Sequence, residues 1–189
     1  MRTRKRVPRS RVLIIALFGA VLLAGGGLTW WYEYAEPVSF VAVAATPARL
    51  IDGIESYGRV DAFLVDLTRQ SLEYEVKRPD PPPREARRPP FAITTVTIRR
   101  YSHLGQVGVL RVAFFNDRLV GVRFFPSAMD AYLARLLSDE GLDLKSQAEA
   151  KPSPHTRVYV ATEQERGRYV GWEDTRLAAE MSLWIKRYS

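Results

Sequence analysis

The longest apolar run of the chain lies close to its N-terminus. Residues 12–31 read VLIIALFGAVLLAGGGLTWW and contain no charged side chain. Twenty residues in a helix extend for about 30 Å, which is the thickness of the hydrocarbon core of a bilayer. Aromatic side chains end the run and continue past it, as in the belt at a membrane surface; they are Trp30, Trp31, Tyr32 and Tyr34. The pattern predicts a transmembrane helix over residues 12–31 that acts as an uncleaved signal anchor.

The charges on the two sides of this run predict its orientation. Residues 1–11 contain six arginines and lysines, whereas Glu33 and Glu36 follow the run. Cationic residues beside a membrane span are retained on the cytoplasmic side. We therefore expect a basic cytoplasmic tail over residues 1–11, a juxtamembrane connector over residues 32–45, and an extracytoplasmic domain over residues 46–189. Arginine outnumbers lysine, which points to a bacterial protein in the plasma (inner) membrane.

A cleaved signal peptide is the alternative topology. The apolar run from Val12 to Leu23 has the length of a signal-peptide core, and Ala24 and Gly26 are small residues at the spacing that precedes a cleavage site. Cleavage would release a secreted domain. Both topologies place residues from about 35 onward outside the cytoplasm.

Small residues recur every four positions within the apolar run, at Ala16, Ala20 and Ala24. Such spacing lets two helices approach closely in lipid, so these alanines are candidates for a helix-packing face. The alternative is that alanine is simply common in membrane helices.

The first pattern after residue 45 resembles a capped helix. Thr46 is a suitable N-cap, Pro47 suits the first helical position, and Gly58 suits the end, so we expect a helix over residues 46–58. Residues 71–77 then alternate between apolar and polar side chains, which predicts a half-buried strand.

Residues 93–125 carry the clearest strand pattern. We expect strands over residues 93–101, 107–115 and 118–125, with Asn116 and Asp117 forming a tight turn. In the simplest register Phe114 faces Leu119 and Val112 faces Gly121. Both faces of this hairpin are then apolar, so either both are covered or one contacts a partner. The candidate partner face consists of Val120, Val122 and Phe124.

The second half of the domain repeats helical and strand patterns. Apolar residues at helical spacing predict a helix over residues 127–141, with Ser127 and Asp130 as a capping box and Gly141 as its end. A polar connector (142–154) and a second hairpin (157–162 and 168–172) follow. Residues 175–188 fit a helix or a strand, and their composition favours a helix. The predicted class is α+β: a mainly antiparallel sheet with two or three packing helices, preceded by one N-terminal transmembrane helix.

Residues 78–90 read RPDPPPREARRPP. Six prolines prevent a continuous helix or strand, so we expect an exposed polyproline-like loop. Its basic side chains are candidates for contact with anionic lipid or an acidic partner, and the alternative is an ordinary solvated loop. The candidates are Arg84, Arg87 and Arg88.

Composition narrows the possible chemistry. The net charge is +7, but +6 of it lies in the first eleven residues, so we do not expect a nucleic-acid-binding domain. The absence of cysteine excludes disulfides and thiol catalysis. Known nucleotide, hydrolase and zinc motifs are missing. His103 and His155 are interpreted as surface residues, and Glu173 and Asp174 should point to opposite faces of a strand. We predict no catalytic residue, no cofactor-binding residue and no metal ligand.

The sequence therefore favours a non-enzymatic function. We expect a binding or accessory subunit of a cell-envelope assembly, whose partners are the lipid bilayer and another envelope protein. Two alternatives remain. One is an envelope hydrolase that uses carboxylates, and the other is a carrier of a small ligand or lipid in a cavity beneath the sheet. The carboxylates considered for the hydrolase are Asp61, Asp66, Glu173 and Asp174.

Overall fold

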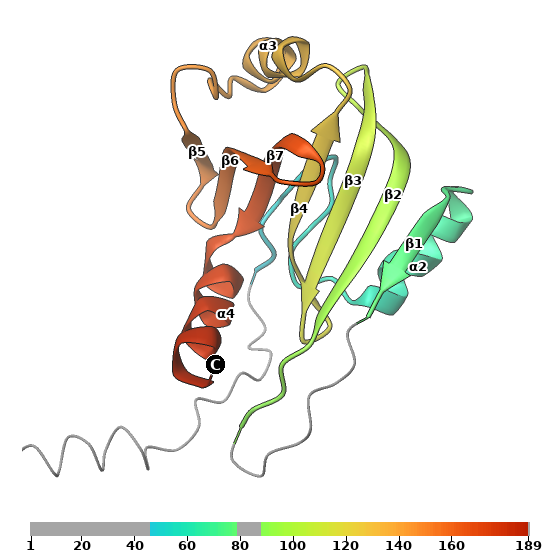
Figure 1. Cartoon of the computed structure of the whole chain (residues 1–189), viewed down its shortest axis with the longest axis vertical. Helices are drawn as coiled ribbons and strands as arrows, with labels where there is room; N and C mark the ends of the chain where they lie inside the picture. Colours follow the sequence, from blue (N-terminus) through green and yellow to red (C-terminus); the bar gives the residue numbers. More distant parts are fainter. Residues whose placement is uncertain (1–45, 79–87, 189) are drawn as a thin grey trace, which may run out of the picture. The chain divides into compact units, whose positions relative to one another are not determined.

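The computed structural model describes residues 46–78 and 88–188 of the chain. These residues form three helices and one seven-stranded antiparallel sheet, so the predicted α+β class is confirmed (Figure 1). In chain order the elements are α2 (Val60–Arg69), β1 (Tyr74–Lys77), β2 (Ile93–His103), β3 (Gln106–Phe115), β4 (Arg118–Pro126), α3 (Met129–Glu140), β5 (Glu149–Ser153), β6 (Thr156–Glu163), β7 (Gly167–Asp174) and α4 (Thr175–Tyr188).

The strand order across the sheet is β1-β2-β3-β4-β7-β6-β5. Two three-stranded units, β2 to β4 and β5 to β7, therefore meet where β4 pairs with β7. Each unit is followed by a helix, α3 after the first and α4 after the second. Because consecutive strands pair within each unit, hairpin turns make most of the connections.

The predicted hairpin between β3 and β4 is confirmed, but its register changes after two residue pairs. Asn116 and Asp117 form the turn with φ values of 48° and 64°. Phe114 faces Leu119 as expected, whereas Val112 faces Val122 instead of Gly121. A β-bulge causes this shift, because Val120 is an extra residue between the pairs Ala113–Gly121 and Phe114–Leu119.

The bulge changes which side chains share a face of the sheet, because a shift of one residue exchanges the two faces. We call the inner face the side on which Val122 and Phe124 pack with α2 and α3. The outer face is the side on which Val120 and Phe115 pack with Leu177 and Trp184 of α4. The predicted grouping of Val120 with Val122 and Phe124 is therefore wrong.

The candidate partner face needs a second correction, because none of its three residues is accessible. Val120 is 5% exposed, Val122 is 2% exposed and Phe124 is fully buried. Of the two sequence interpretations, the one in which both faces are covered is correct at these positions. Their apolar character reflects packing within the domain.

The N-terminal part of the described chain differs most from prediction. The expected helix over 46–58 is wrong, because Asp52 and Gly53 have φ values of 49° and 74° and reverse the chain. Arg49 and Glu55 pair across this reversal. The helix of this region, α2, begins at Val60 instead.

The remaining elements agree with the sequence in kind. The strand expected at 71–77 is present but shorter, as β1. The hairpin expected at 157–162 and 168–172 is confirmed as β6 and β7. The connector expected at 142–154 contains the short strand β5. The C-terminal segment is helical, and Asp174 Oδ1 accepts the Arg176 backbone N–H at 2.9 Å, as an N-cap does.

Helix α3 is confirmed, and it ends at Gly141 in the left-handed conformation with φ 71°. Its predicted capping box is wrong. The N-cap position is Ala128, which makes no side-chain hydrogen bond to the helix. Tyr132, Leu133 and Leu136 are buried against the inner face.

The predicted membrane segment lies outside these elements. None of the helices within residues 46–78 and 88–188 is long and apolar enough to cross a membrane. The segments 1–11, 12–31 and 32–45 lie outside the described residues, as do Ala16, Ala20, Ala24, Arg84 and Arg87.

Candidate binding cleft

A cleft of about 710 Å³ lies between α2, the segment 52–59 and strand β2. This volume is within the range of about 300–1,000 Å³ that is typical of ligand pockets. Buried or half-buried apolar side chains line its interior, among them Phe63, Leu67 and Ile98. Polar side chains line its edge, namely Asp52, Glu55, Arg59, Asp66, Gln70, Arg100, Tyr101 and Ser102. The cleft therefore combines an apolar interior with an edge that carries both signs of charge.

The turn between β3 and β4 positions the helix that forms one wall of the cleft. Asp117 Oδ1 accepts the Val60 backbone N–H at 3.2 Å, and Asp117 Oδ2 lies 2.8 Å from Arg59 Nη2. A carboxylate at a helix N-terminus satisfies a free N–H group and interacts favourably with the helix dipole. One aspartate of the hairpin turn thus fixes both the start of α2 and the orientation of Arg59.

A buried histidine lies next to the cleft, in contact with residues that line it. The side chain of His103 is only 2% exposed. Its Nδ1 lies 2.6 Å from Tyr132 Oη, and its Nε2 lies 3.3 Å from Glu140 Oε1 and 3.5 Å from Asp52 Oδ1. Tyr101 Oη donates to Asp52 Oδ2 at 2.9 Å. These contacts connect the segment 52–59, β2 and α3.

Tyr101 and Tyr132 stay protonated in this cluster. Burial raises the pKa of Tyr101, and the hydrogen bond to Asp52 raises it further. Burial also raises the pKa of Tyr132, and the nearby carboxylate of Glu140 adds to this effect. Both hydroxyl groups are therefore neutral hydrogen-bonding groups at physiological pH. The cluster therefore joins α3 to the cleft wall through hydrogen bonds and close polar contacts.

The histidine prediction is half right. His155 is exposed, but His103 is buried, with the rings of Phe124, Tyr132 and Trp172 packed edge-on against it. Among the described residues, no group of three or more histidines and carboxylates is arranged to hold a metal ion.

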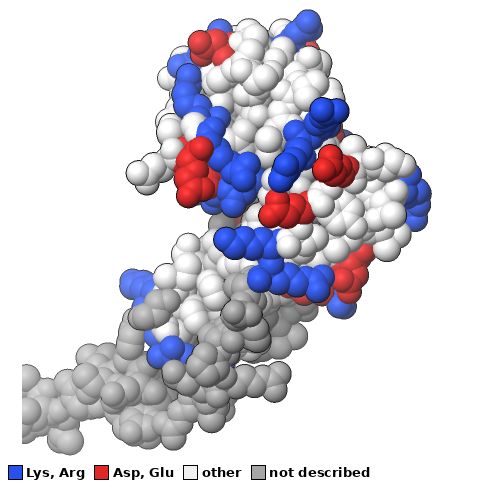
Figure 2. All heavy atoms as spheres, turned by 45° about the vertical axis from the view of Figure 1, so that its right-hand side comes forward, with Lys and Arg blue, Asp and Glu red and all other residues white. Residues whose placement is uncertain are grey.

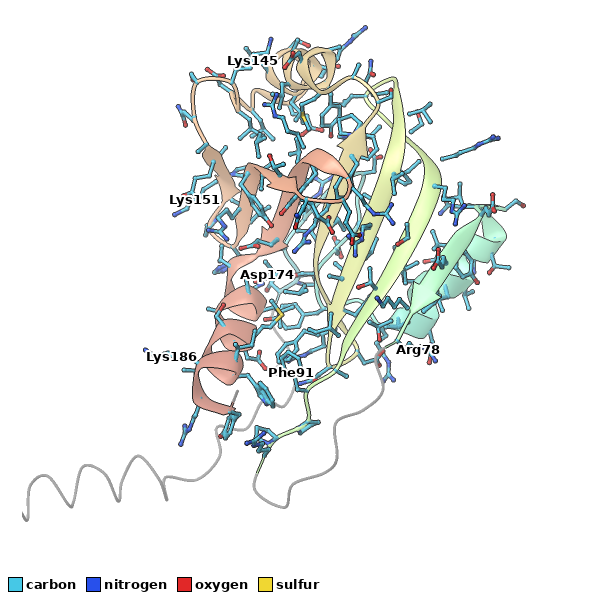
Figure 3. The ribbon with its side chains drawn as sticks, in the orientation of Figure 1. Arg78, Phe91, Lys145, Lys151, Asp174 and Lys186 are labelled. Atoms are coloured by element: carbon cyan, nitrogen blue, oxygen red, sulfur yellow. The ribbon has the colours of Figure 1, made fainter. Side chains whose placement is uncertain are left out.

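Asp174 makes a buried ion pair at the junction of β7 and α4 (Figure 3). Its side chain is fully buried, with Arg176 Nη2 at 2.7 Å and Ser56 Oγ at 2.7 Å from Oδ2. Burial raises the pKa of Asp174, but the hydrogen bonds from Arg176 and Ser56 outweigh burial, and the net pKa is lowered. This carboxylate is ionised, fully hydrogen-bonded and structural.

The four carboxylates considered for a hydrolase are paired with four different arginines. Asp61 and Asp66 on α2 lie 3.8 Å from Arg78 and 3.0 Å from Arg69, and Glu173 lies 2.6 Å from Arg157. Asp174 is paired with Arg176. Glu173 and Asp174 have different partners on different sides of β7, as the strand alternation predicts. Each of the four acids is thus held in its own ion pair, and the four pairs involve different arginines.

The face of the molecule shown in Figure 2 carries charges of both signs. On the face shown in Figure 2, basic and acidic side chains are interspersed over the described part of the domain. Arg88 is the only one of the three predicted loop arginines in the described residues, and it is exposed.

The sequence pattern does not reveal the cleft, because two of its three walls differ from the prediction and only β2 agrees with it. The segment 46–58 was expected to be helical, and α2 was not expected at all. Comparison with known proteins adds no assignment: the chain matches no protein family, and no curated protein matches it.

Proposed function

We propose that the protein is a single-pass membrane-anchored binding or accessory subunit of a bacterial cell-envelope assembly, and that the cleft between α2 and β2 is its binding site. The cleft itself carries this proposal. It is open, it has the volume of a ligand pocket, and the candidate carboxylates around the domain are occupied by ion pairs. A partner with apolar side chains between charged ones matches an apolar interior with a charged edge.

The anchor is supported by the sequence pattern. The charge-free run over residues 12–31 is long enough to span a bilayer, and the basic residues lie on one side of it. Tethering confines the domain to a thin layer at the membrane and raises its effective concentration for neighbours in that layer. A domain that binds its partner weakly benefits from this higher effective concentration.

Protease treatment of spheroplasts tests the topology. The domain should be digested from outside while a short cytoplasmic tail is protected. A domain that survives until the membrane is opened would contradict the proposal. The intact mass of the purified protein tests the alternative, because a mature chain that begins near Gly27 would show a cleaved signal peptide.

A matched pair of substitutions on α2 tests the cleft. Ala62 and Val65 are both exposed, but Ala62 lines the cleft and Val65 does not. Ala62→Trp should fill the cleft and reduce crosslinking and co-purification of the partner from membranes at least tenfold. Val65→Trp adds the same ring to the same helix and should leave capture unchanged. Equal capture by both variants, at equal thermal stability, would show that the cleft is not the binding site.

A further inference from the structure

A second cavity, of about 320 Å³, lies on the outer face of the sheet beside α4. Strand pairing places Arg111, Arg123, Gly171 and Tyr159 opposite one another on β3, β4, β7 and β6. The neighbouring row is Ala113, Gly121, Glu173 and Arg157. Small residues at the centre of the two rows leave a shallow trough, which we call the outer trough.

Close contacts fix the two glycines at the base of the outer trough. A Cβ on Gly121 would lie 2.6 Å from the Trp172 carbonyl oxygen. A Cβ on Gly171 would lie 2.6 Å from the Tyr159 ring. Neither position can accept a larger residue without movement of the sheet or of the ring. The trough is therefore set by the packing of the central strands.

The polar side of the outer trough has an excess of positive charge. Arg111 and Arg123 are direct cross-strand neighbours, and like charges in this position destabilise a sheet. Glu163 pairs with Arg111, and Glu173 pairs with Arg157. Arg123 is exposed, its guanidinium lies 5.3 Å from the centre of the Tyr169 ring, and no carboxylate of the described residues lies within ion-pair distance of it.

The opposite side of the outer trough is apolar. Ala178, Met181 and Ile185 line it from α4, at helical spacing that places them on one face. Ile185 remains 44% exposed, so this wall has apolar surface that the domain itself does not cover. Phe91 extends the wall and contacts Trp184 at 4.2 Å between ring centres, near the lower end of α4 (Figure 3).

We propose that the outer trough binds a small anionic amphiphile, a molecule with one carboxylate head and one short apolar chain. The carboxylate would contact the guanidinium of Arg123, whose planar donors match a carboxylate in two parallel hydrogen bonds. The chain would lie along Met181 and Ile185. The volume of the trough is at the lower end of the range for ligand pockets, which suits a small ligand. This site is separate from the cleft at α2 and does not depend on its function.

Methionine methyl groups provide a direct test. The chain contains three methionines, of which Met181 lines the outer trough and Met129 packs with the inner-face cluster. The full chain, labelled with ¹³C at the methionine methyls and placed in lipid nanodiscs, is titrated with octanoate and followed by NMR. The Met181 signal should shift with saturation, while the Met129 signal should not. Met181→Leu assigns the signal.

Two further arms make the test specific. Arg123→Gln should weaken octanoate binding at least tenfold, whereas Arg99→Gln, an exposed arginine paired with Glu75, should leave it unchanged. Octan-1-ol tests the head group and acetate tests the chain, and both should bind at least tenfold more weakly. Any of three results would overturn the proposal: no response at Met181, equal binding of octanoate and octan-1-ol, or unchanged binding by Arg123→Gln.

Discussion

The two faces of the sheet differ in how they are covered and in what they contain. The inner face is covered by α2 and α3, and its strand residues are aliphatic or aromatic and almost fully buried. The outer face is covered by α4 at one end and carries paired arginines, glutamates and tyrosines elsewhere. The inner face therefore supplies most of the folding stability, and the outer face can vary in its polar chemistry without loss of the fold.

Neighbouring residues on one strand point to opposite faces of the sheet. Substituting each of the two in turn compares the contributions of the inner and outer faces to stability. Phe124 and Phe125 are the clearest pair. Phe124 is fully buried among Tyr101, His103 and Tyr132, whereas Phe125 lies on the outer face against Tyr169. Phe124→Ala should lower the free energy of unfolding by about 3–5 kcal/mol, because it leaves a cavity in a closed core.

Phe125→Ala is the matched control for that change. It should cost less, about 2–3 kcal/mol, because Phe125 is 7% exposed and packs against Tyr169 outside the two core clusters, where neighbouring side chains can rearrange. Urea unfolding of both variants, followed by tryptophan fluorescence, measures the difference. Equal losses would show that the two faces contribute equally and would contradict the division.

Asp174 and Glu173 form a second neighbouring pair, with a somewhat smaller expected effect. Asp174→Asn breaks a fully buried ion pair and should cost about 3 kcal/mol or slightly more, because it leaves the charge of Arg176 without its counter-ion. Glu173→Gln removes a partly exposed pair with Arg157 and should cost about 0–1 kcal/mol. Thermal unfolding of the two variants at neutral pH measures the difference. A larger loss of stability for Glu173→Gln than for Asp174→Asn would contradict the conclusion that Asp174 makes the more important ion pair.

The stability contributed by Asp174 should depend on pH in a defined direction. Its pKa is lowered in the folded state, so the contribution is fully present above the ordinary aspartate value of about 4. It should be lost as the pH falls through the lower, folded-state pKa. The stability difference between the wild type and Asp174→Asn should therefore be constant near neutral pH and decrease below about pH 4. A difference that grows on acidification would show that the pKa is raised.

Tyr132→Phe should have a smaller effect than Phe124→Ala or Asp174→Asn. It removes the hydroxyl that contacts His103 Nδ1 and leaves that nitrogen buried without its partner, which should cost about 1–2 kcal/mol. Tyr74→Phe removes a contact with Thr68 near the surface and should change stability by less than about 0.5 kcal/mol. Chemical denaturation of both variants provides the measurement.

The sequence predicted the elements whose signals are local. The turn at Asn116 and Asp117, the helix α3 with its end at Gly141, and the second hairpin all follow from residue types and spacing. The bulge at Val120 could not be predicted in this way, because it is defined by pairing with a partner strand. One extra residue was enough to assign Val122 and Phe124 to the wrong face.

The candidate sites were less predictable than the fold. The cleft depends on α2, whose N-cap is Arg59 and whose N-terminus is satisfied by Asp117 from a turn far away in the sequence. The outer trough depends on four strands in register and on a helix beside them. Both sites arise from contacts between segments that are distant along the chain. The spacing of apolar residues within one segment does not show which other segments it will contact.

The contacts of Ser56, Asp174 and Arg176 have a mechanical consequence. Arg176 Nη2 donates to the Thr46 carbonyl at 2.8 Å, and Ser56 Oγ accepts from the Ala48 backbone N–H at 2.8 Å. The first described residues are thus fastened to the end of β7, an interior strand of the sheet. A pulling force applied at residue 46 would therefore act on the middle of the sheet and would not peel away an edge strand.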